Sequence, residues 1–270
     1  MIMPCSYHRI VNMSSVRYGH NVNRLKPIFD FAVQSFATTI RPNAQNFDLI
    51  QKTRKELSTF LQVVNKGRNV DNIIYTGTHI RRGDRKTLSY SFQDRRVPIA
   101  DYLKGVATTW SHLHSGALAS ITPVVYLATD SPDARHQFSQ QYQELYQGET
   151  FSLYDTTDPT LRALASPAEY DQSTFDAQFD LQSRIRATRG MIVDLALVSG
   201  LWLTGNDITP ESTVCAMSSS VCRLSAVGLG WERSFGKVDE MGYIDEKTRH
   251  WVEVDEKGQV EPVWQAFQLF

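Results

Sequence analysis

Residues 73–84 read IIYTGTHIRRGD. The first eight are rich in β-branched and apolar side chains, which is typical of a strand buried on both faces. The last four place two arginines, a glycine and an aspartate directly after that strand. The stretch therefore predicts a buried strand over residues 73–80 with positive charge concentrated at its carboxyl end.

Strands and helices alternate along the rest of the chain. Apolar runs predict three further strands, over residues 123–128, 151–154 and 213–217. Helical periodicity or helix-like sequence predicts helices over about 47–64, 98–114, 132–146, 190–202 and 218–230. This alternation favours an α/β fold, a Rossmann-like parallel sheet with helices on both faces.

The two ends of the chain lack this pattern. We expect residues 1–42 to form an irregular segment, residues 43–235 the Rossmann-like domain and residues 236–270 an extension with a short hairpin of residues 241–244 and 250–254. The chain has no run of about 18 apolar residues and no apolar leader at its start. Taken literally, this indicates a cytoplasmic protein.

Ligands of parallel sheets bind at the carboxyl ends of the strands. Several polar residues are expected at that edge, namely Arg81, Arg82, Asp84, Asp130, Asp155, Ser218, Ser219 and Ser220. The chain carries 28 basic and 29 acidic residues, a net charge of −1. This balance argues against a nucleic-acid partner, so any anion site is local.

Arg81 is the strongest candidate for an anion ligand, because the planar guanidinium donates two parallel hydrogen bonds to phosphate. His79 is two residues away and shares its strand face. Asp84 can orient an arginine or accept from a sugar hydroxyl. The alternative is a solvated loop that contains an ion pair.

Three further positions each allow two interpretations. The serines 218–220 begin a helix, where they form either an anion site or a plain N-cap. Asp194 lies in an apolar helix, where it either accepts from the two N–H donors of guanine, or faces solvent or pairs with Arg186 or Arg189. Asp130 either lines a ligand site or caps the helix that follows.

The three cysteines are too few for a disulfide scaffold, and their spacing does not fit a zinc site. Cys215 and Cys222 form either a local disulfide or two buried thiols. Neither glycine-rich phosphate motif is present in the sequence. We expect no metal and no other cofactor.

Four motifs occur in order: HIRRGD at 79–84, YLATD at 126–130, GMIVD at 190–194 and CAMSSSVCR at 215–223. Together they resemble the successive motifs of the α1,6-fucosyltransferases that modify N-glycan cores, and of related bacterial and protein O-fucosyltransferases. The resemblance covers residues 72–231. It implies a two-domain GT-B fold, GDP-fucose as donor, inversion and no metal. This chain would supply the donor-binding half. The family places a second Rossmann-like domain, and usually a Golgi membrane anchor, before the arginine motif, whereas only 78 residues precede His79 here. The alternatives are a fragment that lacks the N-terminal domain, a truncated gene model and a reduced relative.

The resemblance also implies roles for single residues. Arg81 would bind the donor phosphates and stabilise the departing GDP, with support from Arg82. His79 and Asp194 would hold the guanosine. The remaining implied positions are Asp130 lining the site, Ser218, Ser219 and Ser220 on the β-phosphate, the acidic Asp84 and the basic Arg85 as a pair near the donor and acceptor, and Cys215–Cys222 as a disulfide.

One departure concerns the general base. The core-fucosylating enzymes carry a glutamate at the position near Ser89, whereas this chain has no glutamate between Asp84 and Asp94. The base is therefore Asp84, Asp94 or a group from elsewhere. The sequence predicts fucose transfer to a glycan or protein hydroxyl. The alternatives are a non-catalytic GDP-sugar-binding domain and a transferase for another GDP-sugar.

Overall fold

The structure is a computed structural model that describes residues 21–68, 74–84, 86, 96–205 and 207–255. Its centre is a five-stranded parallel sheet in the order β3-β2-β1-β4-β5. The strands are β1 Tyr75–Ile80, β2 Val124–Thr129, β3 Thr150–Phe151, β4 Pro210–Cys215 and β5 Trp251–Glu253. The predicted α/β class with a Rossmann-like parallel sheet is confirmed.

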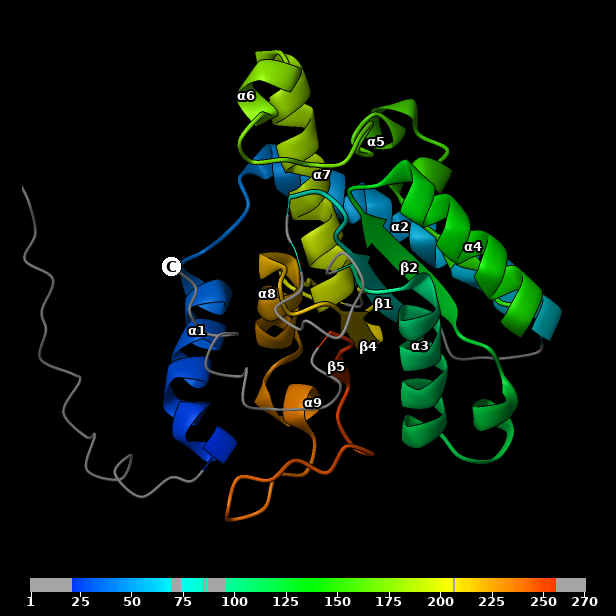
Figure 1. The fold of residues 1–270 in the computed structure, drawn as a ribbon, viewed down its shortest axis with the longest axis vertical. Helices are drawn as coiled ribbons and strands as arrows, with labels where there is room; N and C mark the ends of the chain where they lie inside the picture. The colour runs from blue at the N-terminus through cyan, green and yellow to red at the C-terminus, as the bar shows by residue number, and fades with distance from the viewer. Residues whose placement is uncertain (1–20, 69–73, 85, 87–95, 206, 256–270) are drawn as a thin grey trace, which may run out of the picture.

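Helices cover both faces of the sheet (Figure 1). The longer ones are α1 Lys26–Thr38, α2 Ala44–Arg68, α3 Ile99–Leu113, α4 Pro132–Tyr146, α7 Leu181–Ser199 and α8 Ser220–Leu229. The shorter ones are α5 Pro159–Arg162, α6 Phe175–Gln178 and α9 Trp231–Phe235. No described helix is long and apolar enough to cross a membrane.

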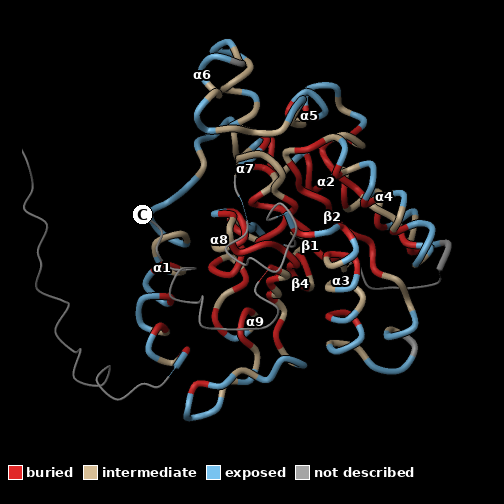
Figure 2. The backbone as a smooth tube through the Cα atoms, in the orientation of Figure 1, coloured by how far each residue is buried: buried red, intermediate tan, exposed pale blue. Residues whose placement is uncertain are grey.

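The apolar residues of β2 alternate between two cores, as the two-residue period of a strand requires. Val124, Tyr126 and Ala128 pack with α2 and α7, whereas Val125 and Leu127 pack with α3 and α4. Figure 2 shows the buried residues gathered on the sheet and on the inner faces of these helices. Such double coverage explains why the strands form near-continuous apolar runs.

Several predicted boundaries shift. β1 begins at Tyr75, and residues 69–73 lie outside the described part of the chain. β4 begins three residues before the prediction and ends at Cys215, and the third strand ends at Phe151 before the 3-10 turn Leu153–Asp155. α7 begins at Leu181, nine residues before the predicted start, because Asp180 caps it by accepting from the Ser183 N–H at 2.8 Å.

The prediction of an irregular segment over residues 1–42 is wrong for its described part. Residues 26–38 form α1, and Phe29 is fully buried against Trp231 and Phe235. The sequence did not indicate this helix, because Ile28 and Phe31 are apolar but exposed. The apolar residues therefore do not form a clear stripe along one face of the helix. The partners that bury Phe29 lie some two hundred residues away along the chain.

The predicted C-terminal hairpin is also wrong. Residues 251–253 form β5, which pairs in parallel with β4 at the edge of the main sheet. Ile244 pairs instead with Val238 through an isolated antiparallel bridge. Trp251 is buried by this arrangement. Residues 251–253, which the local pattern assigned to a hairpin, therefore pair with the edge of β4 instead.

Candidate functional site

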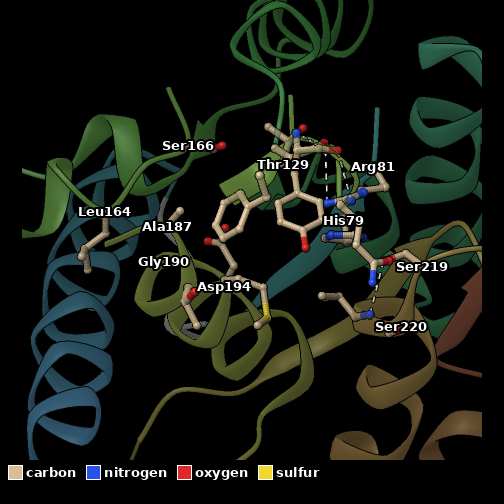
Figure 3. Close-up of a pocket in the computed structure, with 17 residues that line it drawn as sticks. His79, Arg81, Thr129, Leu164, Ser166, Ala187, Gly190, Asp194, Ser219 and Ser220 are labelled. Carbon is tan, nitrogen blue, oxygen red and sulfur yellow. Dashed lines mark hydrogen bonds and ion pairs between the residues drawn. The ribbon is translucent and has the colours of Figure 1, made fainter. Parts of the chain in front are cut away.

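A cavity of about 480 Å³ lies at the carboxyl edge of the sheet (Figure 3). The residues that line it come from the ends of β1 and β2, from α7, from the start of α8 and from the segment after α5. They are His79, Arg81, Thr129, Asp130, Leu164, Ser166, Tyr170, Gln172, Phe175, Ala187, Thr188, Gly190, Met191, Asp194, Ser219, Ser220 and Val221. Residues from five separate parts of the sequence thus meet at one ligand-sized hollow.

Asp130 organises the turn after β1. Its carboxylate accepts from the backbone N–H groups of Arg82 at 2.8 Å, Gly83 at 3.0 Å and Tyr170 at 3.2 Å. It is not the cap of α4, since the Ser131 hydroxyl accepts from the Ala134 N–H at 3.2 Å and takes that role. Asp130 therefore lines the cavity and fixes its arginine-bearing edge.

Arg81 is already paired within the protein. Its Nη2 lies 2.6 Å from Asp84 Oδ1, and its Nη1 lies 3.3 Å from Asp130 Oδ2. The guanidinium also donates to the Tyr170 carbonyl at 3.3 Å and lies 4.4 Å from the centre of the Tyr170 ring. The ion pair that the sequence left as an alternative is present, and Arg81 also lines the cavity.

The turn that carries Asp84 is packed tightly under Tyr170. A Cβ atom at Gly83 would lie 1.7 Å from the Tyr170 carbonyl oxygen, so only glycine fits there. The Asp84 N–H donates to that carbonyl at 3.0 Å. The Asp84 carboxylate accepts from the Gln172 N–H at 3.0 Å. Tyr170 and Gln172 are site residues that the sequence did not indicate, because they lie in a long polar segment without a motif.

Arg82 points away from the cavity. Its Nη1 donates to the Val97 carbonyl at 2.7 Å, and its side chain lines a separate hollow with Arg96 and Glu169. Successive side chains at a strand end project to opposite faces, which separates Arg82 from Arg81. Arg85 lies outside the described residues, as do Ser89 and Asp94.

His79 shares the cavity with Arg81, as their spacing predicted. The side chain is buried, and its Nδ1 atom has no hydrogen-bond partner among the described residues. Burial, followed by the nearby Arg81 charge, lowers the pKa of His79 to about 3. The imidazole is therefore neutral at physiological pH and offers an unpaired polar atom.

Asp194 pairs with a tyrosine. The Tyr126 hydroxyl donates to Asp194 Oδ1 at 2.7 Å. Loss of hydration raises the pKa of Asp194 to about 7, an effect that the Tyr126 hydrogen bond only partly opposes. The neighbouring arginines bind elsewhere, Arg186 to the Ser183 hydroxyl and Arg189 to the Gln45 side chain. Asp194 thus lines the cavity as a carboxyl group that titrates near neutrality.

The turn between β4 and α8 presents two of the three predicted serines to the cavity. Ser219 caps α8 by accepting from the Val221 N–H at 3.2 Å, and Ser220 is the first residue of that helix. Both line the cavity, whereas Ser218 does not. The Ser218 N–H donates to Asp255 at 3.1 Å, and the Met217 N–H donates to the same carboxylate at 2.7 Å.

A disulfide joins Cys215 at the end of β4 to Cys222 in α8, which decides between the two interpretations of these cysteines. It closes the serine-bearing turn covalently. Asp155, by contrast, lies apart from the cavity and pairs with Arg135. The buried carboxylate of Asp255 carried no sequence signal, because it contacts a turn 37 residues away.

The fold and this cavity define the chain as an α/β protein with a Rossmann-like parallel sheet and a site at its carboxyl edge. No protein-family model matches the chain, and no curated protein matches it. The features that indicate a function are therefore the sequence motifs and the chemistry of the cavity.

Proposed function

We propose that this chain is the donor-binding domain of an inverting, metal-independent glycosyltransferase that transfers fucose from GDP-fucose to a glycan or protein hydroxyl. The observation that carries the proposal is the convergence of four sequence motifs on one cavity. His79, Arg81, Asp130, Asp194, Ser219 and Ser220 all line it, although they are separated by up to 141 residues.

The chemistry of these groups suits a nucleoside diphosphate. Transfer with inversion expels GDP, so negative charge develops on its β-phosphate and requires fixed positive groups and N–H donors. Arg81 supplies a guanidinium. The N-terminus of α8 supplies its dipole and the hydroxyls of Ser219 and Ser220. His79 and Asp194, which line the same cavity, then serve the guanosine.

A non-catalytic GDP-sugar-binding domain is the second candidate. It is favoured by the engagement of the carboxylates in and beside the cavity, since Asp84 and Asp130 contact Arg81 and Asp194 contacts Tyr126. Slow hydrolysis of GDP-fucose without an acceptor supports the transferase, whereas binding without turnover supports the second candidate. Tighter binding of another GDP-sugar would assign the transferase a different donor.

The first test is a calorimetric titration with GDP of the wild type, Arg81→Ala and Arg82→Ala. Arg81 lines the cavity and Arg82 points to the other side, so the two variants remove the same charge at adjacent positions. Loss of Arg81 should weaken GDP binding about ten- to hundredfold, the cost of losing a charged donor to phosphate. Arg82→Ala should weaken it by less than about threefold, because the Arg82 side chain points out of the cavity toward Val97.

Two outcomes count against the proposal. Equal losses in both variants mean that only the general positive charge of this edge matters. A folded wild type that does not bind GDP at millimolar concentration excludes this chain as a self-sufficient GDP-binding domain. Near-ultraviolet circular dichroism of each variant confirms that the fold is kept.

A further inference from the structure

We propose that Tyr170 is a positioning residue for Arg81, whose aromatic ring holds the guanidinium in place for a phosphate group of the ligand. This inference rests on the proposed function, since it concerns how the same cavity binds a diphosphate. Tyr170 lies in the long polar segment after α5, outside all four sequence motifs. It therefore adds to the proposed nucleotide site a residue that the resemblance does not assign.

Tyr170 contacts Arg81 through both its side chain and its backbone. The guanidinium carbon of Arg81 lies over the Tyr170 ring, 4.4 Å from its centre, which is within the range of a cation–π interaction. The Tyr170 carbonyl also accepts from Arg81 Nη2 at 3.3 Å. Both residues line the cavity. The ring and the carbonyl thus fix the guanidinium at the edge of the ligand site.

This arrangement leaves N–H donors of Arg81 for a ligand. A guanidinium carries five N–H donors. Among the described residues, the contacts with the Tyr170 carbonyl, Asp84 and Asp130 use at most three of them. Figure 3 shows Arg81 and Ser219 on the same side of the cavity, which suits two groups that contact the same diphosphate.

The ring of Tyr170 can strengthen phosphate binding without touching the phosphate. An arginine side chain has many rotamers, and it loses that freedom when it binds a ligand. A guanidinium that already lies on a ring has lost much of this freedom before the ligand arrives, so more of the contact energy appears as affinity. The effect of the ring is therefore exerted through Arg81.

The backbone of Tyr170 is held by contacts that a side-chain substitution leaves in place. Its N–H donates to Asp130 at 3.2 Å, and its carbonyl accepts from the Asp84 N–H at 3.0 Å. The same carbonyl packs closely on Gly83. A variant at position 170 therefore changes the ring and keeps the turn after β1, so the two roles of this residue can be tested separately.

The test compares GDP binding by calorimetry in the wild type, Tyr170→Leu, Tyr170→Phe and Phe179→Leu. Leucine removes the ring, so GDP should bind roughly three- to tenfold more weakly, the scale of a partly exposed cation–π contact. Phenylalanine keeps the ring and should bind GDP within about twofold of the wild type. Phe179 packs on Phe175 in the same segment and is not among the described residues that line the cavity. Its variant controls for the loss of an aromatic ring and should bind GDP as the wild type does.

A double-mutant cycle with Arg81 separates positioning from a general change of the cavity wall. If the ring acts through Arg81, Tyr170→Leu should change GDP affinity by less than about twofold in a protein that also carries Arg81→Ala. Guanosine provides a second readout. It carries no phosphate, so Tyr170→Leu should bind it as the wild type does. Tyr170→Met serves as a second variant without the ring if the leucine variant does not fold.

Each remaining outcome overturns the proposal. If the wild type binds GDP and Tyr170→Leu binds it equally well, the ring does not position Arg81, while the proposed function stands. If Tyr170→Phe loses as much affinity as Tyr170→Leu, the hydroxyl matters and the ring does not. If the loss extends to guanosine, to the Arg81→Ala background or to Phe179→Leu, the effect is a general change of the cavity. If the wild type does not bind GDP, the positioning role and the proposed function both fall.

Discussion

Nucleotide binding in the cavity is expected to depend on the protonation state of Asp194. Its carboxyl group has a pKa raised from 3.8 to about 7, because burial beside the cavity removes its hydration, and the hydrogen bond from Tyr126 only partly opposes this rise. A protonated carboxyl group donates through one oxygen, whereas the ionised form accepts through both. If Asp194 receives the two N–H donors of guanine, it must ionise when the nucleotide binds.

We therefore expect GDP binding to release close to one proton per site at pH 6 and almost none at pH 8. Calorimetric titrations in buffers of different ionisation enthalpy measure this release directly. Asp194→Asn should abolish it. GDP binding at pH 6 without proton release would place the guanine away from Asp194.

The same pKa makes a prediction about stability that needs no ligand. Below pH 3.8 the folded and unfolded chains both keep this proton, and between about pH 4 and 7 only the folded chain keeps it. Rising pH in that window therefore favours the unfolded chain, by up to about 4 kcal/mol at roughly 1.4 kcal/mol per pKa unit. Wild-type stability should fall relative to Asp194→Asn from pH 4 to 7, as measured by urea unfolding.

For single residues, the alternation of side chains along a strand was sufficient to predict that His79 and Arg81 lie on the same face of the chain. The same rule separates Arg82, which the resemblance had assigned to the site. The partner of Asp194 could not be predicted, because Tyr126 lies 68 residues away and tyrosine in a buried strand carries no special signal. Pairing between distant residues is a property of the packed fold.

Among the elements, the turn between β4 and α8 is held from several sides. The disulfide of Cys215 and Cys222 closes it, and the Arg223 side chain donates to the Met217 carbonyl at 2.9 Å. Asp255, two residues after the end of β5, accepts from the backbone N–H groups of Met217 and Ser218. Asp255 thus positions the turn that leads to Ser219 and Ser220, which line the cavity.

Asp255→Ala should destabilise the protein by about 1–3 kcal/mol, because two backbone donors lose a buried acceptor. It should also weaken GDP binding, since Ser219 and Ser220 follow this turn directly. Glu240→Ala, at an exposed position of the C-terminal part, should change stability by less than about 0.5 kcal/mol. Urea unfolding of both variants checks the first effect, and titration with GDP checks the second.

A wild-type unfolding curve for Asp255→Ala would mean that water replaces the carboxylate at no cost. Local patterns could not have predicted this contact. The period-two signal at residues 250–254 correctly indicated extended chain, but the pairing partner of a strand depends on which sheet edge is open. Here the open edge belongs to β4, more than thirty residues earlier.

For the molecule as a whole, the class of fold was predictable because each buried strand and its covering helix carry their own local pattern. The structures of α1 and β5, near the two ends of the chain, were not predictable, because both elements are stabilised by residues distant in sequence. α1 packs with α8, α9 and Trp251 in a separate apolar cluster. The segment predicted to be irregular is therefore part of the core.

Two phenylalanines in α1 test this conclusion. Phe29 is fully buried and makes edge contacts with Trp231 and Phe235, with ring centres 5.4 Å apart in each pair. Phe31 lies two residues later and is 70% exposed. Phe29→Ala should cost about 3–5 kcal/mol through lost burial and a cavity, whereas Phe31→Ala should cost less than about 0.5 kcal/mol.

Urea unfolding followed by tryptophan fluorescence measures both variants, because Trp231 reports on the cluster itself. If α1 is part of one cooperative fold, Phe29→Ala should lower the midpoint of the whole transition and leave it single. A separate early transition would mean that α1 detaches by itself, with the sheet and its cavity intact. Equal, small effects of the two substitutions would contradict the burial of Phe29 in this apolar cluster.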